Sequence, residues 1–155
     1  MKSDLPPVSF SVPQLRALKK FLGRPPAYPK GNLAENFLLR YVFAEAFCRY
    51  VGRYYRERRV VRNKALTKSH ESIQIDVVGR SFAYFGIRLR PEVLAQFLDS
   101  KLDKRGEKSS RNLRNGIVHR WDENDVAEVS ERYVRLCSIL DAVVEAIACR
   151  ANGGK

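Results

Sequence analysis

Residues 33–59, LAENFLLRYVFAEAFCRYVGRYYRERR, contain no proline and only one glycine, Gly52. Apolar side chains recur in this stretch every three or four residues, which is the spacing of one face of an α-helix. Asn32 precedes the stretch and Glu35 follows three residues later, as in the capping boxes that begin many helices. The stretch therefore predicts one long, largely buried helix, whose apolar face consists of Leu33, Phe37, Leu38, Tyr41, Val42, Ala44, Phe47, Cys48, Val51 and Tyr55.

Shorter helices are predicted on either side of this stretch. Residues 11–22 have Ser11 as a candidate N-cap and Pro13 in the first turn, whereas residues 23–30 contain three prolines and predict a loop. Residues 69–89 are ambiguous, because the isoleucines and valine at 73, 75 and 77 alternate as in a strand but also fit a helix. We assign a helix there because no partner strand is evident elsewhere in the sequence.

The C-terminal half predicts further helices. Pro91 begins one that extends to about residue 102, residues 101–109 form a polar loop, and a helix starts again near Ser110. The last helix covers residues 125–149, with Asp125 as N-cap and Glu128 three residues later. The prediction is an all-α bundle of about five helices, formed by a single domain over residues 11–150 with loose tails at 1–10 and 151–155.

The chain is strongly basic. Its 155 residues include 29 basic and 17 acidic side chains, which gives a net charge of +12 and a pI near 10.0. Residues 1–68 carry 15 basic and 4 acidic side chains, residues 80–120 carry 10 and 4, and residues 121–150 carry 3 and 7. A clustered excess of this size favours a polyanionic partner, above all nucleic acid, over a merely solvated basic face.

The expected location is the cytoplasm. No run of 18 apolar residues exists that would span a membrane, and the first residues lack the apolar stretch of a signal peptide. The odd number of cysteines does not suit a closed set of disulfides. Cys48, Cys137 and Cys149 lie on or beside apolar helix faces, so we predict that all three are core residues.

Several kinds of chemistry are not indicated by the sequence. The two histidines, His70 and His119, and the isolated cysteines show no metal-ligand spacing. No glycine-rich phosphate loop follows a strand, and no GxSxG nucleophile elbow is present. We therefore expect neither a metal nor a cofactor.

Residues 111–121, RNLRNGIVHRW, are the best candidate for a functional segment. On a helical wheel of 100° per residue, Arg111, Asn115 and His119 fall within about 80° of one another, with Arg114 on their flank. Leu113, Ile117 and Trp121 form a separate apolar face. Guanidinium groups suit phosphate, and an imidazole titrates near neutral pH. The alternative is a basic amphipathic helix in which His119 only complements the C-terminal dipole.

Within this segment, RNGIVH at residues 114–119 resembles the R-x4–6-H motif of the HEPN superfamily, in the form with a polar residue directly after the arginine. The motif precedes a final amphipathic helix in an all-helical chain, as in that family. The resemblance implies an HEPN-like helical domain and a metal-independent endoribonuclease that acts as a toxin or a defence effector. It also implies a homodimer, in which both copies of the motif face one composite active site.

The resemblance assigns a role to each residue of the motif. His119 would serve as general base or acid at the RNA 2′-OH or the leaving oxygen, and Arg114 would stabilise charge on the phosphate. Asn115 would orient His119 or the phosphate. The expected products are a 2′,3′-cyclic phosphate and a 5′-OH. On a regular helix Arg114 and His119 lie about 140° apart, so a second copy is needed to supply one of them from the opposite side.

One position departs from a branch of that family. Some HEPN toxins carry a tyrosine two residues after the histidine, which a nucleotidyltransferase antitoxin modifies. Trp121 stands there in this chain and has no hydroxyl to modify. An antitoxin of another type or a regulatory protein is a further expected partner. We interpret Trp121 as a core residue, with stacking on a base as the less favoured alternative.

A second basic region lies at the end of the long predicted helix. Residues 53–64, RYYRERRVVRNK, interleave cations with two adjacent tyrosines, a composition that suits a single-stranded backbone and stacked bases. The alternative is a solvated helix end whose cations complement the dipole. Lys101, Lys104, Arg105 and Lys108 could form another rim near the motif. The predicted RNA-binding residues are Arg53, Arg56, Arg58, Arg59, Arg62, Lys104, Arg105, Lys108, Arg111 and Arg120.

Three functions are compatible with these features. The first is a homodimeric HEPN ribonuclease that acts on RNA with exposed loops. The second is a catalytically silent HEPN module that binds nucleic acid or a partner protein. The third is a helical DNA-binding regulator, which the charge supports but no recognition-helix signature does. The ribonuclease accounts for the largest number of features.

Overall fold

The computed structural model describes residues 6–28, 31–58 and 73–154, and within these ranges every regular element is a helix. The all-α prediction is therefore confirmed, although the described residues form six helices rather than about five. They are α1 (Val12–Leu22), α2 (Leu33–Arg58), α3 (Ile75–Phe85), α4 (Pro91–Leu98), α5 (Ser110–Arg120) and α6 (Glu123–Ala151).

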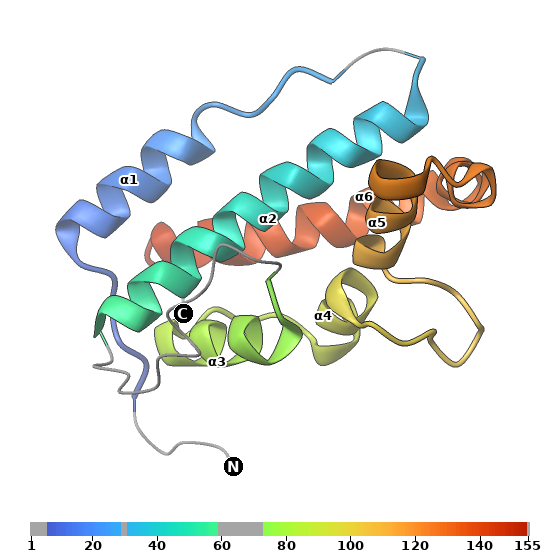
Figure 1. Cartoon of the computed structure of the whole chain (residues 1–155). Coiled ribbons are helices and arrows are strands. Elements are labelled where there is room, and N and C mark those ends of the chain that lie inside the picture. The colour runs from blue at the N-terminus through green and yellow to red at the C-terminus, as the bar shows by residue number, and fades with distance from the viewer. Residues whose placement is uncertain (1–5, 29–30, 59–72, 155) are drawn as a thin grey trace.

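The two longest helices, α2 and α6, pack against each other through the middle of the molecule (Figure 1). Helix α1 lies along one side of this pair, α3 and α4 lie along the other, and α5 stands at one end. Most of the predicted apolar face of α2 is buried in this core, but Leu33 and Val42 are exposed. The face of α6 contributes a continuous row of buried side chains that includes Val129, Leu136, Leu140, Val143 and Ile147.

Both predicted N-terminal caps are present. Ser11 and Gln14 form a reciprocal capping box at α1, in which each side chain accepts a hydrogen bond from the other residue's backbone N–H. Asn32 Oδ1 accepts a hydrogen bond of 3.0 Å from the backbone N–H of Glu35 at the start of α2. Because these side chains satisfy donors that a helix leaves free, they define where both helices begin.

The ambiguous segment contains a helix and no strand where the structure describes it. Residues 69–72 lie outside the described part, and α3 begins at Ile75 and ends at Phe85, with Gly86 as its C-cap, whose φ of 70° suits glycine. Helix α4 ends at Leu98, about four residues earlier than predicted. The reason is that Asp99 adopts an extended conformation, and its carbonyl accepts a hydrogen bond from the Ser109 hydroxyl instead of continuing the helix.

The last helix begins earlier than predicted. Asp122, and not Asp125, is the N-cap of α6, and its carboxylate accepts hydrogen bonds from the backbone N–H groups of Asn124 and Asp125. The spacing of Asp125 and Glu128 resembled a capping box, but the chain turns directly from α5 into α6. Asp125 is thus left within the first turn, where it is 1% exposed.

Two further expectations are corrected at the ends of the chain. Within the segment assigned to a loose N-terminal tail, Phe10 is buried and stacks on Phe85 with ring centroids 4.4 Å apart. Among the cysteines, Cys48 and Cys137 are buried as predicted, but Cys149 is exposed. No helix in the described part of the chain combines the length and the apolar character that crossing a membrane requires.

Candidate functional site

Helix α5, which carries the motif, is anchored at its N-terminus and along one face. The hydroxyl of Ser109 accepts a hydrogen bond from the backbone N–H of Asn112, as an N-cap does. Leu113 and Ile117 are buried, as the helical wheel predicted, and the helix packs against α6, α4 and α2. The side chains of the opposite face are therefore held by a fixed backbone.

Helices α5 and α6 approach each other closely at Gly116, in the middle of the motif. A Cβ at this position would lie 2.8 Å from Cγ of Asp125 and nearer still to Oδ2, so only glycine fits without a shift. Oδ1 of the same carboxylate lies 2.6 Å from Nζ of Lys108, while Oδ2 has no hydrogen-bond partner among the described residues. A buried carboxylate and its ammonium partner thus fix the two helices at this point.

Arg114 and Asn115 interact directly. Nη1 of Arg114 donates a hydrogen bond of 2.8 Å to Oδ1 of Asn115, and the guanidinium lies 6.0 Å from the centroid of the Tyr41 ring. Burial, together with Glu45, raises the pKa of Tyr41, and the positive charges of Arg114 and Arg111 oppose that rise. Tyr41 was predicted only as a core residue, because a spacing pattern within one helix gives no sign of its contact with another helix.

Arg114 also retains an unused donor. Its Nε is buried and has no hydrogen-bond partner among the described residues. An unsatisfied buried donor costs about 1–3 kcal/mol and often marks a functional position. The guanidinium is therefore held in place by Asn115 and Tyr41 with part of its hydrogen-bonding capacity unused.

His119 lies in the last turn of α5 and is exposed. Within the described residues, no hydrogen bond or ion pair joins it to Arg114 or Asn115. One copy of the chain thus places an exposed imidazole and a partly buried guanidinium on the same helix without bringing them together. Of the flanking predicted RNA-binding residues, Arg120 is exposed and Arg111 is partly buried.

Trp121 is not a core residue, and that prediction is wrong. It is the C-cap of α5, with a left-handed backbone conformation (φ 48°, ψ 51°) and 64% of its surface exposed. The helical wheel placed its ring beside Leu113 and Ile117 by extending α5 one residue too far. The change of backbone direction at the cap turns the side chain away from the core.

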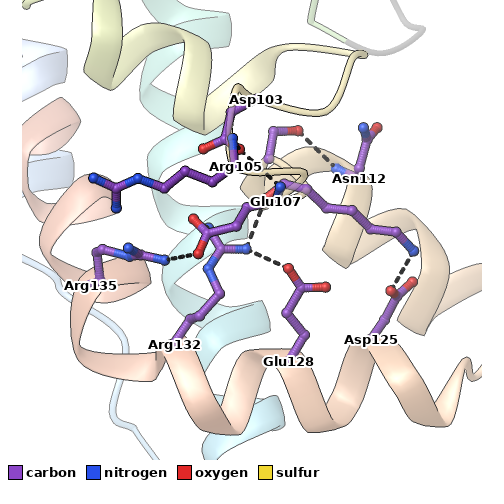
Figure 2. A network of polar contacts seen from close by, with 10 residues as sticks. Asp103, Arg105, Glu107, Asn112, Asp125, Glu128, Arg132 and Arg135 are labelled. Atoms are coloured by element: carbon purple, nitrogen blue, oxygen red, sulfur yellow. Dashed lines mark hydrogen bonds and ion pairs between the residues drawn. The ribbon is translucent and has the colours of Figure 1, made fainter.

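The loop at 99–109 is ordered by a carboxylate (Figure 2). Asp103 Oδ1 accepts hydrogen bonds from the backbone N–H groups of Arg105, at 2.8 Å, and Glu107, at 2.9 Å. The hydrogen bond from Glu107, then that from Arg105, lowers the pKa of Asp103 below its ordinary value. Lys104 and Arg105 are exposed in this turn. Lys108, by contrast, forms an ion pair with Asp125.

Helix α6 holds the same loop from the other side. Glu107 pairs with Arg135 at 2.5 Å and with Arg132 at 3.6 Å (Figure 2). Arg132 also donates to the carbonyl of Lys108 and pairs with Glu128 one turn earlier in α6. The network connects the basic loop to the acidic last helix.

The basic end of α2 differs from its prediction in one respect. Arg53 and Arg58 are exposed and Arg56 is partly buried, while Arg59 and Arg62 lie outside the described residues. Burial, with Arg53 and Arg49 nearby, lowers the pKa of Arg56. The two tyrosines of this region are both 7% exposed, so the expectation that they stack on bases is wrong: Tyr54 packs on Phe10, and Tyr55 packs on Tyr84.

Among residues 6–28, 31–58 and 73–154, no three histidine, cysteine, aspartate or glutamate side chains are grouped so that they could hold a metal ion. Comparison of the chain with protein-family models, with curated proteins and with solved structures found no match in any of the three. Together, the fold and the motif define a class, an all-helical protein with an arginine, an asparagine and an exposed histidine on one short helix.

Proposed function

We propose that this chain is a homodimeric endoribonuclease of the HEPN type that serves as a toxin or defence effector. The observation that carries the proposal is the arrangement on α5, where Arg114 is held by Asn115 and Tyr41 while His119 stands exposed one turn further along. RNA transesterification can use a cation that binds phosphate and an imidazole that acts as general base or acid.

In the proposed reaction the 2′-OH of RNA is the nucleophile. His119 of one copy removes the 2′ proton, the 2′ oxygen bonds to phosphorus, and the bond from phosphorus to the 5′ oxygen breaks. The leaving 5′ oxygen takes up a proton from water, so that the products are a 2′,3′-cyclic phosphate and a 5′-OH. Arg114 stabilises the charge that develops on the phosphate oxygens, and Asn115 keeps the guanidinium in place.

The proposal includes a dimer because one copy separates the two groups. A composite site across a two-fold axis would take Arg114 from one copy and His119 from the other. Arg111, Arg120 and the exposed cations of the 99–109 loop, Lys104 and Arg105, would add phosphate contacts. Lys108 remains a predicted phosphate contact. Because it pairs with Asp125, however, a substitution of Lys108 would first lower the stability of the fold.

The test is cleavage of total RNA in the presence of EDTA, with 5′-OH ends mapped by sequencing. Wild-type protein is expected to cut, and His119→Ala and Arg114→Ala are expected to lower the rate at least 100-fold, within the range for loss of a general base or a charge-stabilising donor. Arg80→Ala is the matched control, because Arg80 is an exposed cation of α3 outside the motif and outside the predicted RNA-binding residues. Uncut RNA with wild-type protein would contradict the proposal and leave a silent binding module.

A mixing experiment tests the composite site separately. When the two inactive variants His119→Ala and Arg114→Ala are co-expressed, random pairing makes about half of the dimers mixed, and each mixed dimer has one intact Arg–His pair. Activity should return to about a quarter of the wild-type level. No recovery, with mixed dimers confirmed by mass, would mean that each site draws on one copy only.

A further inference from the structure

Trp121 combines two features that are each unusual for a tryptophan. It is the only non-glycine residue with a positive φ among the described residues, and its ring is 64% exposed. It is also the only tryptophan of the chain. A left-handed conformation costs a residue other than glycine about 1–2 kcal/mol, and helix ends of this kind normally carry glycine or asparagine.

The fold accounts for the conformation but not for the side chain. Helix α5 ends at Arg120 and α6 begins at Glu123, so the chain must reverse within two residues. The backbone N–H of Trp121 donates to the carbonyl of Ile117 at 3.0 Å, and that of Asp122 donates to Gly116 at 3.1 Å. These bonds would be equally available to glycine. A strained conformation kept by a bulky residue that is 64% exposed points to a role outside the fold.

The ring is preceded by basic residues and followed by acidic ones in the sequence. His119 and Arg120 immediately precede it and are both exposed. Two carboxylates follow it: Asp122 caps α6 by accepting hydrogen bonds from the backbone N–H groups of Asn124 and Asp125, and Glu123 is exposed. An exposed aromatic plane next to Arg120, on a chain with a net charge of +12, matches the chemistry of single-stranded nucleic acid, which offers flat bases on a charged backbone.

We infer that Trp121 stacks on an unpaired base of the bound RNA, next to the nucleotide presented to His119. The inference rests on the proposed function in taking RNA as the ligand. The end of α5 then binds RNA as well as cleaving it: the ring of Trp121 stacks on one base, and His119 and Arg120 contact the adjoining phosphodiester. Such stacking tolerates any base, because every base has a π face, and it requires a single-stranded site.

The test uses an RNA oligonucleotide that is 2′-O-methylated throughout, which has no free 2′-OH and therefore cannot be cleaved. Because Trp121 is the only tryptophan, its fluorescence reports on the site directly. We expect quenching by the oligonucleotide and none by an abasic strand of the same length and charge. Binding of a labelled oligonucleotide should weaken about 5- to 150-fold in Trp121→Asn and stay near wild type in Trp121→Phe.

Two controls separate stacking from other effects. Asparagine tolerates the left-handed conformation, so Trp121→Asn should melt no lower than wild type, and a loss of affinity cannot then be ascribed to unfolding. Val118→Ala changes a neighbouring exposed apolar residue and should bind as wild type does. Equal affinity of Trp121→Asn and wild-type protein would overturn the inference. So would a change in emission that follows protein concentration without RNA, since a second copy would then cover the ring.

The outcome is independent of catalysis. If the abasic control and Trp121→Asn behave as expected but no RNA is cut, the ribonuclease proposal fails and stacking on a base stands. If RNA is cut in a manner that depends on His119 and Arg114 while Trp121→Asn binds and quenching is absent, the inference fails and the ribonuclease stands.

Discussion

The C-terminal ends of α2 and α5 both have aromatic residues next to an arginine, but the aromatic rings are buried at one end and exposed at the other. At α2, Tyr54 and Tyr55 are buried in the core beneath exposed arginines. At α5, Trp121 stands exposed after His119 and Arg120. An aromatic residue beside an arginine is therefore part of the core at the end of α2 and an accessible ring at the end of α5.

Helix phase and helix length explain the difference. Tyr54 and Tyr55 lie inside a continuous helix, so their positions on its wheel decide that they face Phe10 and α3. Trp121 lies at the first residue that leaves the helix, where the wheel no longer applies. Adjacency of aromatic and basic residues in a sequence thus gives no evidence of base stacking until the helix boundary is known.

The largest expected difference in stability is between two truncations of an aromatic side chain, one at the end of α2 and one at the end of α5. Tyr55→Ala removes a buried aromatic side chain and should lower the free energy of unfolding by about 3–5 kcal/mol, because a cavity remains. Trp121→Ala should change it by no more than about 0.5 kcal/mol, since an exposed ring loses no packing. Urea denaturation of both variants measures the contrast. Similar losses for the two would mean that Trp121 packs on the protein after all.

The pair of Lys108 and Asp125 gives the next effect. Lys108→Ala leaves a carboxylate that is 1% exposed without its ion-pair partner and should cost about 2–3 kcal/mol. Lys104→Ala, the matched change at an exposed residue of the same loop, should fall within about 0.5 kcal/mol. Thermal melts and RNA affinities are measured for both variants. Together they distinguish a cation that stabilises the fold from one that binds RNA. Equal melting temperatures for Lys108→Ala and Lys104→Ala would show that the ion pair of Lys108 and Asp125 does not stabilise the position of α5.

Glycine substitutions should have opposite signs in the two helices. Gly116→Ala brings a Cβ against the carboxylate of Asp125 and should destabilise by about 1–3 kcal/mol, because α5 or α6 must move. Gly52→Ala meets nothing within 4 Å and should stabilise α2 by up to about 1 kcal/mol through helix propensity. Denaturation midpoints decide the signs. A gain at both positions would show that the contact between α5 and α6 yields easily.

These contrasts mark what the sequence can predict. Caps at Ser11 and Asn32, the apolar face of α2 and the start of α5 follow from local patterns, since spacing and side-chain chemistry act within a few residues. The end of α4 depends on a distant partner, Ser109, and the choice of Asp122 over Asp125 as the cap of α6 depends on where α5 ends. The same holds for the site: its residues are adjacent in sequence, but Tyr41 beneath Arg114 and Asp125 against Gly116 come from other helices.

A smaller effect is expected from relieving the backbone of Trp121. Trp121→Gly should raise the free energy of unfolding by about 1 kcal/mol, because glycine adopts the left-handed conformation without strain. Arg120→Gly, one residue earlier and within α5, should lower it by a similar amount. Calorimetry of the two variants compares two adjacent positions that are both exposed to solvent. A loss in both would mean that the ring of Trp121 contributes to the fold and would weaken the contrast with Tyr55.

The smallest effect concerns the loop that leads into α5 and depends on pH. Backbone hydrogen bonds lower the pKa of Asp103 in the folded chain, so the carboxylate contributes stability above its unfolded pKa of about 3.9 and loses it as pH falls through the lower, folded value. Asp103→Ala should therefore be less stable than wild type at neutral pH, and the gap should close below about pH 4. Denaturation series at several pH values measure the gap. If it stayed constant with pH, uncharged contacts would order the loop, and the cations Lys104 and Arg105 would owe their placement to Glu107 and α6 instead.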